Sequence, residues 1–272
     1  MIVLKTEKEI EIMAENAAIL REILVELALK AIPGTTTAQL DRLAERRIRE
    51  AGAKSAFKGY TDELHRIPYP ATICASLNEE VVHGIPSEER VLQEGDILSI
   101  DLGFVRKGYY ADAAITVGVG EVSEEAERMM AVAREALKRA VGMATIGRRL
   151  SDLSHAISST VRKAGYYVVK EYTGHGIGRE LHEDPRVLNH GSPGRGPKLR
   201  AGMVFCIEPM VKGDDLPLRT KDDGWTAVTR TGSLSVHYEE MVAVTPEGPR
   251  VLTGWIWEEY CRRKTLSACA AR

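Results

Sequence analysis

A helix–glycine–helix–glycine pattern occurs twice in this chain, 113 residues apart, and limits the folds open to it. In the first copy, a capping box at Thr6 and Glu9 begins a helix, and a second helix spans about residues 37–51. Five positions are identical after the shift: Gly34 and Gly147, Leu40 and Leu153, Arg49 and Arg162, Ala51 and Ala164, Gly52 and Gly165. Strand-like sequence follows each copy, and after the second copy it spans Tyr166–Tyr172. Beyond it we expect a glycine-rich turn at residues 173–183, a long loop at residues 184–202, and a hairpin that turns at Thr231-Gly232 between strands from Trp225 and from Ser233 onwards, the second carrying Glu239 and Glu240. We therefore expect an α+β protein of two related halves, about residues 1–121 and 122–250, which share one sheet.

The composition is that of an ordinary globular protein, with 272 residues, 44% hydrophobic and 28% charged. The formal net charge of −2 predicts neither a nucleic-acid partner nor an anionic membrane. The N-terminus lacks the apolar core of a signal peptide, and no apolar run has the length of a membrane span. The four cysteines form no C-x-x-C pair, so neither a zinc site nor a disulfide framework is indicated. We expect a cytoplasmic protein.

Two runs rich in apolar and β-branched residues, 96–105 and 109–117, flank a short polar turn and predict a β-hairpin. If the turn is centred on residues 106 and 107, Asp101 lies directly opposite Asp112, with Cβ atoms roughly 4.5–5.5 Å apart. Two carboxylates so placed among apolar neighbours would repel each other and be desolvated, and a bound cation would remove the problem. A register slip of one residue would place them on opposite faces, and the alternative is that each caps a turn.

Further carboxylates and imidazoles interrupt apolar strands or lie in glycine-rich turns. Together with the hairpin pair they are Asp101, Asp112, His175, Glu208 and Glu239, with His83 and His182 in similar contexts. A salt bridge for Glu208 and ordinary turn positions for the histidines are the alternatives. Four carboxylates and one imidazole are enough to hold two divalent ions about 3.5–4 Å apart, as in metallohydrolases. Manganese, iron(II), cobalt or zinc would suit such donors. Neither a G-x-S-x-G elbow nor a G-x-G-x-x-G fingerprint is present.

Six sequence blocks in order resemble the type I methionine aminopeptidases, over about residues 3–250. They are Asn78–Pro86, Asp101 with Asp112, Thr173–Gly178, His182–Pro185, Ile207–Met210 and Asp223–Thr226. The resemblance implies the pita-bread fold, in which pseudo-twofold duplicated halves surround a curved, mainly antiparallel sheet with helices on the outside. It implies one catalytic domain, residues 1–250, followed by a C-terminal extension, residues 251–272.

The resemblance also implies roles for individual residues. Asp101, Asp112, His175, Glu208 and Glu239 would ligate two divalent metal ions (cobalt, manganese, iron or zinc), with Asp112 and Glu239 bridging them. His83 and His182 would flank the scissile carbonyl, and Glu208 would carry the proton. Tyr69, Cys74, Leu181 and Trp225 would wall a pocket for the methionine side chain, and by composition alone these four could equally be ordinary core.

The implied activity is removal of the initiator methionine from nascent polypeptides whose second residue is small, through attack by a metal-bridging hydroxide. We expect a monomer, and docking on the ribosome is left open. An Xaa-Pro peptidase and a metal-free binding protein are the rival interpretations. Only 30 residues separate Glu208 from Glu239, too few for the insert of the type II enzymes. Residues 61–68 form an insertion relative to the family, and the tail from about Trp255 is unfamiliar.

Overall fold

A computed structural model describes residues 1–61 and 67–270. The insertion expected at residues 61–68 therefore lies mostly outside the described residues. The described helices are α1 (Glu7–Lys30), α2 (Thr37–Glu50), α3 (Glu124–Gly142), α4 (Leu150–Lys163) and α5 (Ile256–Ala270). None of them combines the length and the apolar character needed to cross a membrane.

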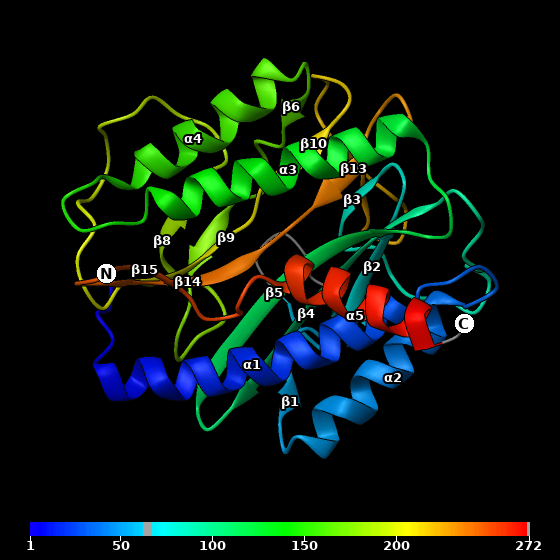
Figure 1. The fold of residues 1–272 in the computed structure, drawn as a ribbon, viewed down its shortest axis with the longest axis horizontal. Helices are drawn as coiled ribbons and strands as arrows, with labels where there is room; N and C mark the ends of the chain where they lie inside the picture. The colour runs from blue at the N-terminus through cyan, green and yellow to red at the C-terminus, as the bar shows by residue number, and fades with distance from the viewer. Residues whose placement is uncertain (62–66, 271–272) are drawn as a thin grey trace.

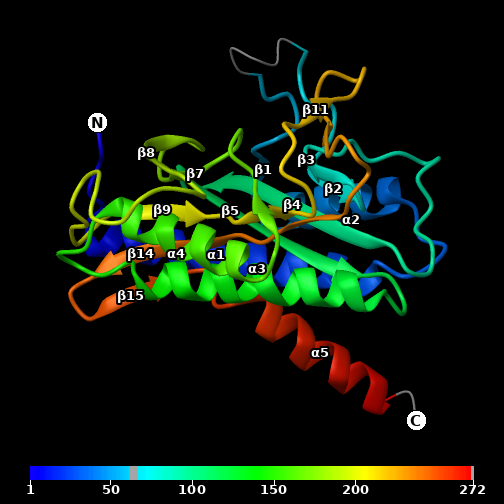
Figure 2. The same cartoon turned by 90° about the horizontal axis from the view of Figure 1, so that it is seen from above.

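The described strands form four antiparallel sheets, with the helices packed outside them (Figures 1 and 2). The two halves were expected to share one sheet, but their main strands pair in two separate sheets. One sheet holds β1 (Lys54–Ser55), β2 (Ile73–Leu77), β4 (Ile97–Arg106) and β5 (Tyr109–Gly118). A second holds β7 (Gly174–Gly176), β8 (Glu183–Val187), β9 (Val204–Ile207), β14 (Glu240–Thr245) and β15 (Gly248–Val251). A third holds β6 (Tyr167–Val168), β10 (Met210–Lys212) and β13 (Ser235–His237), and the fourth holds β3 (Glu80–Val82), β11 (Arg219–Thr220) and β12 (Ala227–Val228).

Equivalent residues of the two copies of the repeat make equivalent contacts. Helices α2 and α4 have 14 residues each and begin 113 positions apart. The residue before each helix, Thr36 or Arg149, makes an isolated antiparallel bridge to a distant loop. At the other end, Gly52 and Gly165 donate to the carbonyl oxygens of Arg49 and Arg162. The expected α+β architecture is therefore visible in the backbone hydrogen bonds.

The hairpin of β4 and β5 forms, but its register differs from the prediction. Arg106 pairs with Tyr109, so the two-residue turn is Lys107-Gly108, with φ of 52° and 75°. Positive φ at both positions defines a type I′ turn, which the twist of a hairpin favours. Asp101 consequently faces Ala114, and Asp112 faces Gly103. Because the partner shifts by two positions, both aspartates still lie on one face.

Side-chain hydrogen bonds from β5 join the first half of the chain to the second. The hydroxyl of Thr116 donates to the carbonyl oxygen of His237 at 2.8 Å and accepts from its N–H at 2.9 Å. The N–H of Glu239 donates to the carbonyl oxygen of Ala114 at 2.9 Å. These bonds place the end of β13 beside β5 and bring Glu239 close to Asp112.

Three local predictions in the second half are wrong. Tyr166–Tyr172 was expected to be one strand, but only Tyr167–Val168 is extended. Residues 225–240 were expected to form a hairpin, whereas β12 pairs with β3 and β11, and β13 pairs with β10. Residues 174–176 and 183–187, expected in a turn and a loop, form strands β7 and β8. Strands β6 and β12 pair with the distant β10 and β3, whereas β7 and β8 pair with each other, so in each case strand pairing overrides the local pattern.

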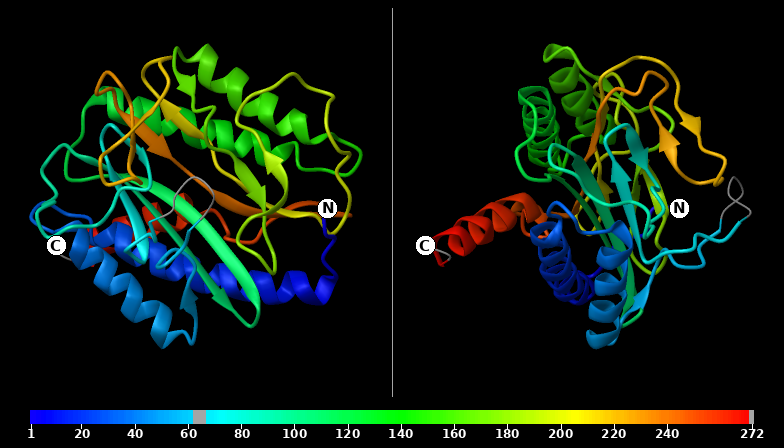
Figure 3. Two further views of the ribbon diagram at one scale, coloured as in Figure 1. Left: turned by 180° about the vertical axis from the view of Figure 1, so that it is seen from behind. Right: turned by 90° about the vertical axis from the view of Figure 1, so that its right-hand side faces the viewer.

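The tail folds into α5, which packs first against α1 and then projects away from the body (Figures 2 and 3). Its start is held by the buried carboxylate of Glu240, which accepts from the N–H of Ile256 at 2.8 Å and from the hydroxyl of Thr253. Arg263 forms ion pairs with Glu22 on α1 and with Glu259 on its own helix. The C-terminal extension is therefore a helix anchored next to Glu239.

Candidate metal centre

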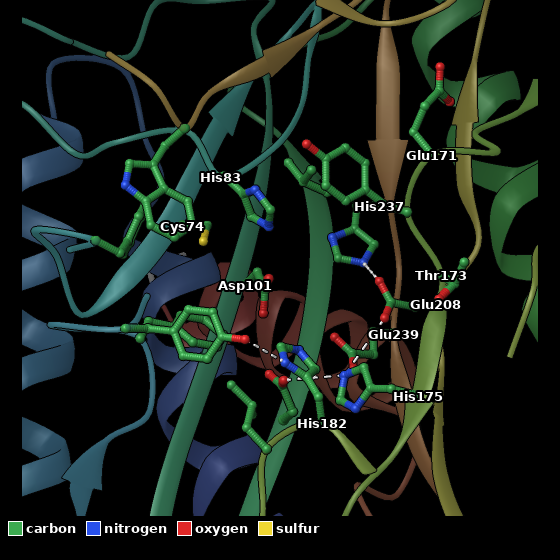
Figure 4. A pocket seen from close by; sticks show the side chains of 18 of the residues that line it. Cys74, His83, Asp101, Glu171, Thr173, His175, His182, Glu208, His237 and Glu239 are labelled. Atoms are coloured by element: carbon green, nitrogen blue, oxygen red, sulfur yellow. Dashed lines mark hydrogen bonds and ion pairs between the residues drawn. The ribbon is translucent and has the colours of Figure 1, made fainter. Parts of the chain in front are cut away.

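The five predicted metal ligands come from five chain segments and line one pocket. Figure 4 labels four of them, Asp101, His175, Glu208 and Glu239. Asp101 comes from β4, Asp112 from β5 and His175 from β7; Glu208 follows β9 and Glu239 precedes β14. The Nε2 atom of His175 lies 3.8 Å from Asp112 Oδ2, 3.8 Å from Glu208 Oε1 and 4.0 Å from Glu239 Oε1. Oxygen atoms of Asp101, Asp112 and Glu239 lie within 4.8 Å of one another.

A glycine makes room for these carboxylates. Gly103 lies opposite Asp112 in the β4–β5 ladder. A Cβ atom at this position would approach Phe57 Cε1 to 2.8 Å and Asp112 Oδ1 to 3.1 Å. Glycine inside a strand often marks such a close approach. Replacing it would push the aspartate or the aromatic ring out of place.

The donor set fits divalent cations. Oxygen atoms of Asp101, Asp112 and Glu239 are buried and lack a hydrogen-bond partner among the described residues. Burial raises the pKa of Asp101 to about 6. Burial and then the Glu239 carboxylate raise the pKa of Asp112 well above its usual range, and burial followed by Glu208 does the same for Glu239. Ligands of one ion lie roughly 3–4 Å apart at ordinary bond lengths, so the separations around His175 suit a shared cation.

The imidazole of His175 is oriented for coordination. Its Nδ1 lies 3.0 Å from the carbonyl oxygen of Gly176, and because a carbonyl only accepts, Nδ1 carries the proton. Burial, and then the neighbouring ring of His182, lower the pKa of His175 to about 3. The ring is therefore neutral, with the lone pair of Nε2 directed at the carboxylates, as metal-binding histidines require.

A cavity of about 250 Å³ adjoins the carboxylates, and the four residues predicted to wall a methionine pocket line it. Tyr69, Cys74, Leu181 and Trp225 are all buried. The rings of Tyr69 and Trp225 meet edge to face with centroids 5.1 Å apart. The indole N–H of Trp225 donates to the carbonyl oxygen of Ile67 at 2.9 Å. An apolar pocket with aromatic walls and one sulfur suits a thioether side chain.

The remaining two predicted residues, His83 and His182, line the same cavity. The ring of His182 stacks edge to face on His175, with centroids 4.5 Å apart. The ring of His83 lies 5.1 Å from that of Tyr172 and 5.7 Å from that of Trp225. His83 has φ of 61°, an uncommon backbone conformation of the kind that clusters at functional sites.

Comparison with known proteins decides the family. The family model described as "Metallopeptidase family M24" matches residues 11–246. The chain belongs to metallopeptidase family M24. Its fold and its resemblance to the methionine aminopeptidases are thereby confirmed, and it is a metal-dependent hydrolase.

Curated members of this family are similar over nearly their whole length. A methionine aminopeptidase of Clostridium acetobutylicum is 51% identical over 253 residues, which cover 93% of this chain and 99% of the relative. Methionine aminopeptidase 1 of Mycobacterium tuberculosis is 45% identical, over 90% of this chain and 92% of the relative.

Solved structures of the family show the same fold. The crystal structure of methionine aminopeptidase from Thermotoga maritima matches with a TM-score of 0.89 and 44% identity, covering 93% of this chain and 99% of that one. A prolidase from Pyrococcus horikoshii matches with a TM-score of 0.71 and 26% identity, and the match covers only 63% of its chain.

Two residues at the site of this family member were not predicted. His237 is buried, and its Nε2 lies 3.2 Å from Glu208 Oε2. Its signal was available, because strand alternation puts His237 on the same face as Glu239. The hydroxyl of Tyr60 lies 2.9 Å from Nδ1 of His182. Its sequence position, 122 residues away, gave no hint of this contact.

Proposed function

We propose that this protein removes N-terminal methionine from peptides and nascent proteins by metal-dependent hydrolysis. The observation that carries the proposal is that a single cavity is lined both by the five predicted metal ligands and by the four residues predicted to hold the methionine side chain. Figure 4 shows part of this arrangement. The pocket would hold the methionine side chain while the carboxylates and imidazole hold two divalent ions beside the first peptide bond. The names of the similar curated proteins support the same activity.

Two ions held by Asp101, Asp112, His175, Glu208 and Glu239 would supply a nucleophilic hydroxide near neutral pH and polarise the scissile carbonyl. Cobalt, manganese, iron or zinc would each suit these donors. Proton transfer and the contacts to the substrate are provided by side chains, chiefly Glu208, His182 and His83.

Glu208 is the proposed proton carrier. Its Oε1 lies 3.8 Å from His175 Nε2 and its Oε2 lies 3.2 Å from His237 Nε2. Burial, and then the charge of Asp101, raise the pKa of Glu208 well above its usual range. A carboxyl group with a raised pKa can take a proton from the attacking water and return it to the leaving amine.

His182 is the proposed donor to the substrate carbonyl oxygen. A hydrogen bond from the Tyr60 hydroxyl to His182 Nδ1 would leave the proton on Nε2, because neutral imidazole carries only one. A preorganised N–H at this point would stabilise charge that develops on the carbonyl oxygen in the transition state. His83, on the opposite wall beside Trp225, would contact the scissile nitrogen.

Peptide mass spectrometry tests the proposal. Peptides that start with Met-Ala, Met-Lys, Leu-Ala and Ala-Pro would be incubated together with the protein, with manganese or cobalt and with chelator as the control. We expect metal-dependent loss of methionine from the Met-Ala peptide alone, since the resemblance to the methionine aminopeptidases implies a preference for a small second residue. Trimming of the Ala-Pro peptide instead would indicate an Xaa-Pro peptidase. No cleavage under any metal would refute both.

We further propose that the protein acts as a cytoplasmic monomer and docks on the ribosome. Support comes from a basic strip where the turn before α4 meets the loop before β9, made of Arg148, Arg149, Arg195, Lys198 and Arg200. The nearby Asp152 is occupied by the N–H groups of Arg149 and Gly194. Co-sedimentation with ribosomes at two salt concentrations tests docking. Charge reversal of the four exposed members of the strip, Arg148, Arg195, Lys198 and Arg200, should abolish co-sedimentation.

A further inference from the structure

The thiol of Cys206 lies beside the metal centre without a role in the reaction described above. Along β9, side chains alternate between the two faces, so Cys206 shares the face of Glu208. Cys206 is completely buried. Its sulfur, a ring nitrogen of His175 and a carboxylate oxygen of Glu239 all lie within 4.8 Å of one another.

Glu239 and His175, which lie next to this thiol, each have an atom that is available to bind a metal ion. The Oε1 atom of Glu239, a residue only 3% exposed, has no hydrogen-bond partner among the described residues. The Nδ1 proton of His175 is engaged by Gly176, which leaves Nε2 at 4.0 Å from Glu239 Oε1. Nitrogen, sulfur and oxygen donors therefore point into one small volume.

This set differs chemically from the oxygen-rich set of Asp101, Asp112 and Glu239. Hard ions such as manganese prefer carboxylates, whereas thiolate ligands select softer ions. At zinc bond lengths of about 2.3 Å to sulfur and 2.0–2.1 Å to nitrogen, tetrahedral donors lie roughly 3.5 Å apart. The three donor atoms lie within 4.8 Å of one another, so they have to move closer together to share one cation.

We propose that His175, Cys206 and Glu239 form a second ligand set, which takes a thiophilic divalent cation such as cadmium or zinc in place of an oxygen-ligated ion. The inference rests on the proposed metal centre and adds a sulfur ligand to it. As the sulfur–metal bond forms, the thiol proton passes to solvent, and no electron is transferred. Cadmium or excess zinc would thus displace the ion of the oxygen-rich set and inhibit hydrolysis.

Cadmium titration of the metal-stripped protein tests the proposal through the ultraviolet charge-transfer band of a cadmium–thiolate bond. The chain has four cysteines, so the experiment uses a Cys261→Ser/Cys269→Ser background in which Cys74 and Cys206 remain. We expect a band that saturates at one cadmium per chain. It should vanish in Cys206→Ser and persist in Cys74→Ser, the matched control, whose buried thiol lies in neither ligand group.

A band absent from the background protein, or one that survives Cys206→Ser, would overturn the proposal. Cadmium-113 NMR of the background protein detects sulfur ligation without any change at Cys206, so the test holds even if that variant does not fold. Manganese binding and Met-Ala cleavage are measured in parallel. If cadmium gives the thiolate band but the cadmium-free, manganese-loaded protein cleaves no Met-Ala peptide, the proposed function is refuted and the sulfur ligand stands. We expect Cys206→Ser to weaken cadmium binding about 10-fold or more.

Discussion

The N-terminal segment holds the loop that carries His182 through a buried ion pair. Lys5 Nζ lies 2.5 Å from Glu183 Oε2, and the two side chains are only 3% and 11% exposed. The other oxygen of Glu183 accepts from the N–H groups of Arg179 at 2.7 Å and Glu180 at 3.3 Å. Gly178 lies so close that a Cβ atom there would be 2.5 Å from both side chains. We predict that Lys5→Met lowers both stability and turnover.

The expected loss of stability arises because the substitution leaves the charged Glu183 carboxylate buried without its partner. Removing one partner of a buried ion pair costs about 3–5 kcal/mol, because the other charge remains buried without compensation. Two backbone N–H groups still bind the Glu183 carboxylate, so we expect the lower end, about 3 kcal/mol. For a chain of this size, each kcal/mol lowers the melting temperature by roughly 2–4 °C. The variant should therefore melt about 6–12 °C lower.

Lys107→Met is the matched control. Lys107 pairs with Glu15 at 2.6 Å, close to the distance of the buried pair, but the two side chains are 48% and 56% exposed. Exposed pairs contribute about 0–1 kcal/mol. Calorimetry measures the melting temperatures of both variants and of the double variant Lys5→Met/Glu183→Gln, which should recover part of the loss. Equal decreases in melting temperature for the two lysine variants would refute the reasoning. A fall in the metal content of Lys5→Met would also refute it, because the loop should affect kcat and not metal loading.

Three further predictions concern the site. Asp101→Ala should lose metal and activity together, as measured by elemental analysis and Met-Ala cleavage; an active, fully loaded variant would contradict the ligand assignment. Metal affinity should rise with pH, because protons compete for a carboxyl whose pKa is about 6, and it should fall up to about 10-fold per unit below that value in calorimetric titrations; a flat profile from pH 5 to 7 would exclude this competition. Tyr60→Phe should lower kcat/KM about 10-fold through loss of the bond to His182, with metal content unchanged, and an unaffected rate would show that the tyrosine does not orient the ring.

The sequence allowed the elements of the repeat to be predicted because their signals are local. The capping box at Thr6 and Glu9 forms as expected, and Ser123 caps α3. The predicted hairpin register was wrong because the two-residue turn is Lys107-Gly108, whose positive φ values give a type I′ turn. The error was harmless to the site only because it shifted the pairing by an even number of residues.

Contacts that depend on tertiary structure could not be read locally. Thr116 bonds His237 across 121 positions, and the side chain of Thr116 replaces part of a backbone ladder there. Tyr60 reaches His182 across 122 positions. No periodicity or capping pattern encodes such pairs. His237, in contrast, lies two positions before Glu239 in the strand predicted from Ser233 onwards, so alternation along that strand could have identified it.

The placement of the site where the two halves meet has an energetic consequence. Asp101 and Asp112 come from the first half, and His175, Glu208 and Glu239 come from the second. Without a cation these carboxyl groups crowd one another: burial, and then repulsion by neighbouring carboxylates, raises the pKa values of Asp112 and Glu239. Cations bound by these groups would turn repulsion across the junction into attraction. In the proposed enzyme, metal binding would therefore complete the active site and also hold its two halves together, beyond the bonds that Thr116 provides.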